Sequence, residues 1–373
     1  MAVKRQLSMV LDLNKCIGCH TCTSACKLQW TNRNGREYMY WNNVETRPGT
    51  GYPKNFHEMG GGFDEDGALR LGKEPSAEDY GVPWEYNYEE ALMTGTDPWL
   101  RPNVKPTWGA NWDEDEGEGD YPHSYYFYLP RLCNHCANPA CLAACSRNAI
   151  YKRQEDGIVL IDQSRCRGYK KCVEQCPYKK PMYRGETRMS EKCIACYPRV
   201  EGKDPITKGR RMEARCMAAC VGKIRMNGLL SGDYKKPDPK NPLDWLVHIH
   251  KVALPLYPQF GTEPNIYYIP PRWAPRSYLR QMFGPGVDEA LDKYASPSRT
   301  LMAVLALFRA SQTMIARFEV EDGPKIYESE VMGKKVEVYN DTAIGYASDG
   351  TEMVRIKIEE PTWESDEKRM VTY

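Results

Sequence analysis

The sequence lacks any long hydrophobic run and any marked excess of charge. Its longest apolar stretch, Leu301–Phe308, has eight residues, whereas a helix needs about 18 or more to span a membrane. The 51 Lys and Arg residues nearly balance the 50 Asp and Glu residues, so bulk charge gives no reason to expect a nucleic-acid partner. We therefore predict no direct membrane span and no binding of nucleic acid.

The N-terminus lacks the features of an export signal. Lys4 and Arg5 supply two positive charges, but no apolar segment or small-residue cleavage site follows them, and the pair is not a twin-arginine motif. We expect a chain that either works in the cytoplasm or leaves it already folded on a partner that has a signal.

Catalytic motifs are missing as well. Nothing resembles a catalytic triad or a phosphate-binding loop, and we interpret the scattered histidines as packing or surface residues: His123, His135, His248 and His250. What the sequence does have is cysteine, with 15 in 373 residues. An odd number argues against complete pairing into disulfides, and a chain of this length can build its core without them.

The cysteines fall into four groups with short, regular gaps. The first group has the spacing of the bacterial ferredoxin run, and in the third group Tyr169 stands where that run has its second cysteine. The groups are Cys16-x2-Cys19-x2-Cys22-x3-Cys26, Cys133-x2-Cys136-x4-Cys141-x3-Cys145, Cys166-x5-Cys172-x3-Cys176, and Cys193-x2-Cys196 followed by Cys216-x3-Cys220.

This spacing predicts iron–sulfur clusters. Gaps of two residues let successive thiolates of one loop bind different irons of one cube, and a gap of three turns the next cysteine toward another cluster. Three four-iron clusters need twelve thiolates and one three-iron cluster needs three, which uses all 15 cysteines. Zinc, which isolated Cys-x2-Cys pairs also bind, and structural disulfides are the weaker alternatives.

We predict an α+β fold with two ferredoxin-like modules of the βαβ type, long irregular insertions, and a C-terminal helix with a small antiparallel sheet. The patterns favour a strand at Ser8–Leu13, a helix at Cys22–Trp30, a hairpin around Glu155-Asp156-Gly157, a helix at Pro297–Phe318 and a sheet over Phe318–Ile358. Residues 1–26 with 190–230 form one module, residues 122–189 form the other, and residues 231–373 form a C-terminal extension for subunit contacts.

Residues 27–121 form a long insertion that holds six of the nine tryptophans, among them Trp41, Trp84, Trp99 and Trp108. We interpret it as a contact surface for a large partner, with a loop folded over its own core as the alternative. The acidic run Asp113–Asp120 is typical of a solvated loop. Cations are frequent around the later cysteine groups, and those near a cluster favour its reduced state: Arg165, Arg167, Lys170, Lys171, Lys179, Lys180, Arg184, Arg188 and Lys192.

Several segments carry a resemblance to a known family. Tyr128–Cys141, Ile150–Tyr169 and Ser190–Arg199 resemble the β subunit of the membrane-bound nitrate reductase group. Further segments resemble a subgroup, the type II DMSO reductase (molybdopterin) family, which contains ethylbenzene, steroid C25 and dimethyl sulfide dehydrogenases and perchlorate and selenate reductases. These segments are Asp12–Cys19, Tyr40–Thr46, Ala253–Pro264, Tyr267–Pro271 and Tyr278–Val287.

The resemblance implies four ligand sets. Tyr169 replaces the tryptophan of nitrate reductases at the position without a thiolate, where one iron corner stays empty. The sets are Cys16, Cys19, Cys22 and Cys220 for one [4Fe-4S] cluster; Cys26, Cys193, Cys196 and Cys216 for the second; Cys133, Cys136, Cys141 and Cys176 for the third; and Cys145, Cys166 and Cys172 for a [3Fe-4S] cluster.

The resemblance also implies a role and partners. Such a β subunit has no substrate site of its own and relays single electrons between a molybdopterin-containing catalytic α subunit and, usually, a haem b γ subunit. A free-standing iron–sulfur enzyme is the alternative from another class. We expect a hydrocarbon- or sterol-hydroxylating dehydrogenase complex, with a perchlorate, selenate or nitrate reductase or a nitrite oxidoreductase as the alternative. The implied location is the periplasm, reached by co-export with the α subunit, or else the cytoplasmic face of the membrane.

Overall fold

The computed structural model describes residues 3–81, 125–310, 313–331, 333–359, 363–364 and 369–370. The interpretations made for Trp84, Trp99, Trp108, Asp113–Asp120 and His123 lie outside these residues. Within the described ranges, no helix has both the length and the apolar character needed to cross a membrane.

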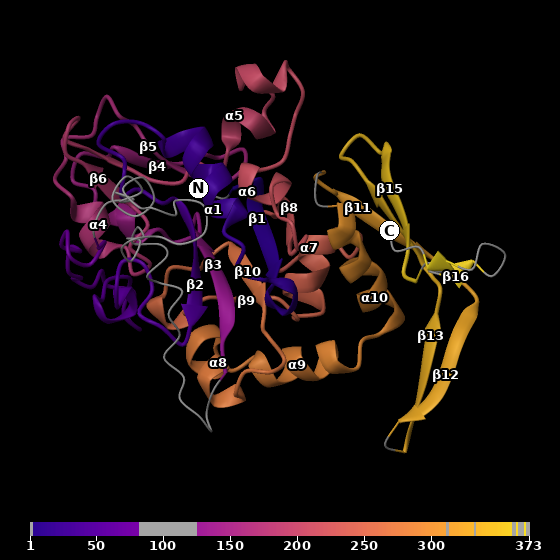
Figure 1. Cartoon of the computed structure of the whole chain (residues 1–373). Coiled ribbons are helices and arrows are strands. Elements are labelled where there is room, and N and C mark those ends of the chain that lie inside the picture. Colours follow the sequence, from indigo (N-terminus) through magenta and orange to yellow (C-terminus); the bar gives the residue numbers. More distant parts are fainter. Residues whose placement is uncertain are drawn as a thin grey trace, which may run out of the picture.

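A four-stranded sheet in the order β8-β1-β10-β9 forms the centre of the molecule (Figure 1). Strand β1 (Arg5–Asp12) pairs antiparallel with β8 (Arg225–Ser231) and parallel with β10 (Ile266–Ile269), and β10 pairs antiparallel with β9 (Leu254–Pro255). The N-terminal strand thus pairs with a strand at the end of the 190–230 segment. Residues 254–269, which we assigned to the C-terminal extension, contribute two strands to the same sheet.

The cysteine loops connect short elements on one side of this sheet. β2 (Asn42–Arg47), which lies in the insertion, pairs with β3 (Phe127–Leu132) ahead of the second cysteine group. The expected hairpin forms from β4 (Ile150–Lys152) and β5 (Val159–Ile161). The remaining elements are α1 (Thr21–Cys26) with a π turn (Lys27–Thr31), α3 (Ala140–Ala143), α4 (Lys171–Gln175), β6 (Met182–Arg184), β7 (Met189–Glu191), α5 (Tyr197–Val200) and α6 (Arg215–Ala218).

The C-terminal part adds helices and a three-stranded sheet. α7 (Pro242–Asp244), α8 (Arg276–Phe283), α9 (Val287–Ala295) and α10 (Arg299–Ala306) precede the sheet. Its strands are β11 (Arg317–Glu321), β14 (Thr342–Tyr346) and β15 (Glu352–Lys357), in the order β11-β14-β15. The hairpin of β12 (Lys325–Val331) and β13 (Lys334–Tyr339) projects from this region (Figure 1), and the strands β16 (Trp363–Glu364) and β17 (Arg369–Met370) form a separate pair.

The helix predicted over Pro297–Phe318 is shorter than expected. It ends at Ala306, continues as a 3-10 turn over Leu307–Ala310, and residues from Arg317 onward form β11. Ile315 and Phe318 nevertheless join the hydrophobic core that contains Leu301, Val304 and Phe308. Their apolar spacing reflects burial against this core, which Ile315 reaches from the irregular segment before β11 and Phe318 reaches from β11 itself.

Candidate iron–sulfur centres

The fifteen cysteines line four separate cavities, and each cavity gathers one of the four sets that the resemblance implied. All fifteen are free of disulfide bonds. The first cavity is lined by Cys16, Cys19, Cys22 and Cys220; the second by Cys26, Cys193, Cys196 and Cys216; the third by Cys133, Cys136, Cys141 and Cys176; and the fourth by Cys145, Cys166 and Cys172.

The sulfur atoms surround each cavity without converging on one point. Among the described residues, no three His, Cys, Asp or Glu side chains come close enough together to hold a single metal ion. A cluster of several irons binds each thiolate at a separate corner, so its ligands lie farther apart than those of one tetrahedral ion. The arrangement of the thiols therefore suits a multi-iron cluster.

Four short helical segments carry cysteines to two cavities each. α1 brings Cys22 to the first cavity and Cys26 to the second, because the four-residue separation places them one turn apart. The segment that begins with α6 repeats this with Cys216 and Cys220, and the segments of α3 and α4 do so for the third and fourth cavities. Each three-residue gap thus places its two cysteines in neighbouring cavities, as the spacing predicted.

The first cavity opens toward the surface. Cys19 is exposed, and the flanking apolar residues Ile17 and Val221 are each 62% exposed. Gly18 has φ +66°, and a Cβ there would lie 2.5 Å from the ring of Tyr128. Glycine is therefore required for the turn that separates the first two cysteines.

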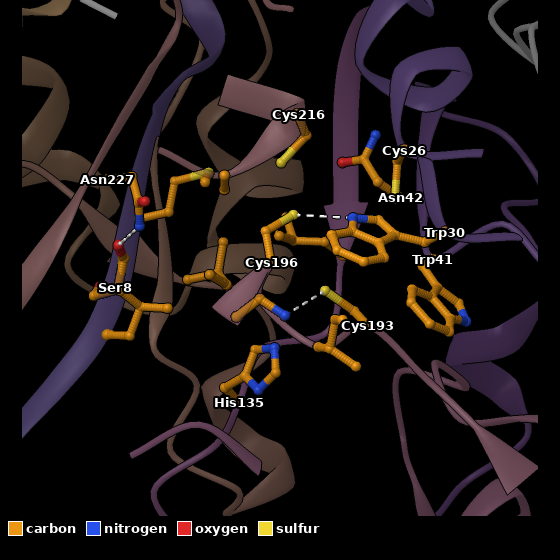
Figure 2. Close-up of a pocket in the computed structure, with 17 residues that line it drawn as sticks. Ser8, Cys26, Trp30, Trp41, Asn42, His135, Cys193, Cys196, Cys216 and Asn227 are labelled. Atoms are coloured by element: carbon orange, nitrogen blue, oxygen red, sulfur yellow. Dashed lines mark hydrogen bonds between the residues drawn. The ribbon is translucent and has the colours of Figure 1, made fainter. Parts of the chain in front are cut away.

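The second cavity is buried beside the central sheet (Figure 2). Its sulfur atoms accept hydrogen bonds: Cys196 Sγ from the indole Nε1 of Trp30 at 3.2 Å and from the Arg215 amide at 3.3 Å, and Cys193 Sγ from the Ala195 amide at 3.4 Å. Burial raises the pKa of Cys216 to about 12. The raised pKa means that burial disfavours the thiolate form. A bound metal offsets this effect because it stabilises the thiolate that coordinates it.

The third cavity shares a wall with the second, formed by the buried residue His135. Its Nδ1 accepts a hydrogen bond from the Val159 amide at 3.1 Å, so the ring proton is at Nε2. Burial and the charges of Lys192 and Lys152 lower the pKa of His135 well below its ordinary value, which keeps the ring neutral. Lys192, also buried, donates to Cys133 Sγ at 3.6 Å and to the Cys193 carbonyl at 3.1 Å.

The fourth cavity contains Tyr169 in the place of a cysteine. Gly168 and Lys170 have φ values of +66° and 59°, and in the first cavity Gly18 and His20 have 66° and 53° around Cys19. Tyr169 therefore occupies a turn of the same form as Cys19 but supplies no thiolate, and it is 60% exposed. The lining includes four cations and no carboxylate: Arg147, Arg167, Lys170 and Lys171.

The cations predicted near the clusters divide between interior and surface. Lys179, Lys180 and Lys192 are buried, whereas the others are half-buried or exposed. Burial and the charge of Arg131 lower the pKa of Lys180 to about 7. The sequence interpretation did not assign Trp30 or Arg225 to these sites, and it treated His135 as an ordinary packing residue.

Replacing Gly168 tests the turn beside Tyr169. A Cβ at Gly168 would lie 2.2 Å from the Arg188 carbonyl oxygen at a φ of +66°, so we expect Gly168→Ala to destabilise the fold by about 2 kcal/mol or more. Gly67→Ala is the matched control, because Gly67 has φ +77° with nothing within 4 Å, and we expect it to cost about 1 kcal/mol. Denaturant unfolding of both variants measures the difference; equal losses would show that the contact with Arg188 does not matter.

Two protein families match the chain, and their ranges contain all fifteen cysteines. Residues 124–230 match the 4Fe-4S dicluster domain, and residues 7–28 match a 4Fe-4S binding domain. These matches support clusters of the 4Fe-4S type in the protein. The number of clusters and the three-iron type at the fourth cavity remain predictions.

Relatives extend the likeness over most of the chain. The β subunit of dimethylsulfide dehydrogenase from Rhodovulum sulfidophilum is 63% identical over 305 residues, which covers 78% of this chain and 90% of that protein. The chain belongs to the iron–sulfur β subunits of the DMSO reductase family. The β subunit of selenate reductase from Thauera selenatis is 53% identical over 307 residues (77% and 89% covered), and that of respiratory nitrate reductase from Haloferax mediterranei is 52% identical over 307 residues (78% and 85% covered).

Membership confirms the predicted family and the role of an electron-transfer subunit within an oxidoreductase complex. The prediction of a hydrocarbon- or sterol-hydroxylating complex receives no support, because none of these three relatives is named for such a substrate. The alternative, a reductase complex, fits the selenate and nitrate reductase relatives better.

Proposed function

We propose that this β subunit carries single electrons through three [4Fe-4S] clusters and one [3Fe-4S] cluster, between a molybdenum-containing catalytic α subunit and a haem b γ subunit or another carrier. The observation that supports this proposal most strongly is the series of four cysteine-lined cavities. The clusters would supply reversible one-electron redox chemistry. The residues of the chain would hold them, and in the second and third cavities they bury most of the cysteine sulfur atoms and donate hydrogen bonds to several of them.

The cavities have an order that suits a relay. The first and second share α1, the second and third share the wall at His135, and the third and fourth share α3 and α4. The first and fourth, at the two ends, have exposed residues in their walls, namely Cys19 and Tyr169. An electron can therefore enter at one end and leave at the other without a substrate site on this chain.

The two ends differ in the kind of contact they favour. Exposed Ile17 and Val221 give the first cavity an apolar edge, which suits a permanent subunit interface. Four cations line the fourth cavity. Lys170 and Lys171 pair with Glu74 and Glu174, whereas Arg147 and Arg167 have no ion pair among the described residues, which suits a partner with a negative surface. We assign the α subunit to the first end and the haem b subunit or carrier to the fourth.

The iron content and the direction of electron flow test the proposal in the complex purified with its catalytic partner under anaerobic conditions. We expect 15 irons per β subunit after subtraction of the α subunit's own iron, and a single three-iron paramagnetic signal in the oxidised state. We also expect selenate, perchlorate or nitrate to oxidise reduced viologen, with dimethyl sulfide, ethylbenzene and a sterol assayed with an oxidising dye as the other arm. An isolated β subunit that turns over any of these substrates would overturn the relay role.

Location is a separate proposal. We propose that the β subunit is exported with the α subunit, as the resemblance implies, and that a twin-arginine signal on that partner directs the export. Cell fractionation with the partner's signal intact and with its two arginines replaced by lysine tests this. A β subunit that stays in the cytoplasm in both cases would overturn it.

A further inference from the structure

Arg225 is a fully buried cation between the first and second cavities. It is the first residue of β8 and is 0% exposed. Its Nη2 donates to Cys22 Sγ at 3.2 Å and to Asn42 Oδ1 at 3.1 Å, and its Nη1 donates to Met9 Sδ at 3.6 Å. Cys22 and Arg225 line the first cavity, while Asn42 and Met9 line the second. The guanidinium therefore contacts the wall of both cavities.

No carboxylate among the described residues balances this charge. The side-chain partners of the guanidinium are Cys22 Sγ, Asn42 Oδ1 and Met9 Sδ, and none of them is a carboxylate. By contrast, the fully buried Arg47 and Arg131 both pair with Glu45, at 2.8 Å and 2.5 Å. A buried charge without a counter-ion strongly destabilises a fold, so we infer that anions at the cysteine sites balance the charge of Arg225.

The strand explains how the side chain reaches this position. Arg225 and Asn227 alternate with Met226 and Gly228 along β8. Asn227 lines the second cavity, whereas Met226 belongs to the hydrophobic core on the other side of the sheet. The face of β8 toward the cavities is thus polar, and the backbone holds the guanidinium in one place without help from a flexible loop.

We propose that Arg225 raises the reduction potentials of the first two centres above the values that they would have without its charge. This inference rests on the proposed relay. Each transfer removes one electron from one centre and adds it to the neighbour, with no bond formed or broken, so the reduced centre gains one negative charge. A fixed positive charge that contacts a sulfur ligand of the first centre and wall residues of the second stabilises that more negative state, and the hydrogen bond to Cys22 Sγ acts in the same direction at the first centre. Arg225 therefore affects the redox step through its charge and does not itself accept an electron.

Potentiometric titration of the intact complex, followed by electron paramagnetic resonance, tests this with Arg225→Met and Arg225→Lys. For Arg225→Met we expect the equilibrium constant for reduction of each of the first two centres to fall at least tenfold. This lowers each reduction potential by about 59 mV or more, since the couple transfers one electron. Arg225→Lys retains the positive charge, so its reduction potentials should lie close to those of the wild type. The third and fourth centres should keep their potentials and serve as internal controls.

Lys15→Met is the matched control for charge removal. Lys15 lines the same cavity but is 38% exposed and pairs with Asp12 at 3.3 Å, so solvent and Asp12 screen it and we expect a smaller shift. Unchanged potentials in Arg225→Met, or an equal shift in Lys15→Met, would overturn the role of Arg225. If no cluster signal comes from the first two cavities in the wild-type complex, the proposed relay itself fails.

A second measurement needs no variant and covers the case in which Arg225→Met does not fold. Wild-type complex is prepared with arginine labelled with ¹⁵N only in the guanidinium group, and the reduced clusters are examined by pulsed electron paramagnetic resonance. The contact at 3.2 Å predicts a ¹⁵N coupling to the first centre through the N–H···S bond. Absence of any such coupling while that centre is reduced would overturn the proposal.

Discussion

Tyr169→Cys should convert the fourth centre from three irons to four. The turn that carries Tyr169 has the same backbone form as the turn that carries Cys19, with φ values of +66° and 59° against 66° and 53° at the flanking residues. A thiolate at position 169 would therefore take the place that Cys19 has in the first cavity. The new ligand adds negative charge to the centre, and its potential should fall.

The expected effects are large and can be separated by two measurements. The iron content should rise from 15 to 16 per β subunit, and the paramagnetic signal of the oxidised three-iron centre should disappear. Electron flow between substrate and the carrier at this end should slow at least tenfold, because a centre of lowered potential becomes an uphill step; one tenfold change in a one-electron equilibrium is about 59 mV. Tyr169→Trp is the matched control, since it too supplies no thiolate and should keep three irons. Sixteen irons in the wild type would contradict the assignment.

Local spacing was enough to predict the ligand loops. The gaps within Cys16–Cys26 and within Cys133–Cys145 determine which sulfur atoms share a loop and which lie one helical turn apart, and the structure gathers them in that way. The hairpin of β4 and β5 was also predictable, because Glu155-Asp156-Gly157 provides the turn and Gly157 has φ +67°. In these regions the chemistry of neighbouring residues determines the structure.

Long-range pairings were not predictable from local patterns. Ile266–Ile269 lies more than 250 residues after β1 yet pairs with it in parallel, and no turn or spacing signal links the two segments. Ile315 lies just before β11 and Phe318 lies within it, and both pack into the same core that a longer helix would have reached. Tertiary packing decided both cases.

The functional residues that the sequence interpretation missed are those that act from outside the cysteine runs. Arg225 follows Cys220 by five residues and lies in a strand with Met226 and Leu230 on its apolar side. A charged residue on the inward side of such a strand is a signal of a buried counter-ion, because cations are almost never fully buried without a partner. His135, between Cys133 and Cys136, could have been assigned to a cavity wall by its place within a ligand loop.

Glu45→Ala should cause the largest loss of stability, because this carboxylate is the shared counter-ion of a buried network. Glu45 is 0% exposed and pairs with Arg131 at 2.5 Å and with Arg47 at 2.8 Å. It also accepts hydrogen bonds from the Asn43 amide side chain and the Tyr52 backbone amide, both at 3.0 Å. Removing it leaves two buried guanidinium groups without a carboxylate, which costs about 3–5 kcal/mol. Denaturant unfolding measures this loss.

The pH dependence of stability follows from the same network. Burial alone would raise the pKa of Glu45, but the charges of Arg131 and Arg47 lower it to about 2. The ordinary value for glutamate is about 4.3, so the stabilisation is fully present above that pH and is lost as the pH falls toward 2. Glu45→Ala should lack this acid-dependent component.

Glu337→Ala is the matched control, because Lys335, Tyr339 and Lys325 also lower the pKa of Glu337 to about 2, but Glu337 lies on the exposed hairpin. Solvent screens such a surface group, so its removal should change stability little; equal losses in the two variants would show that burial of the network is not what matters.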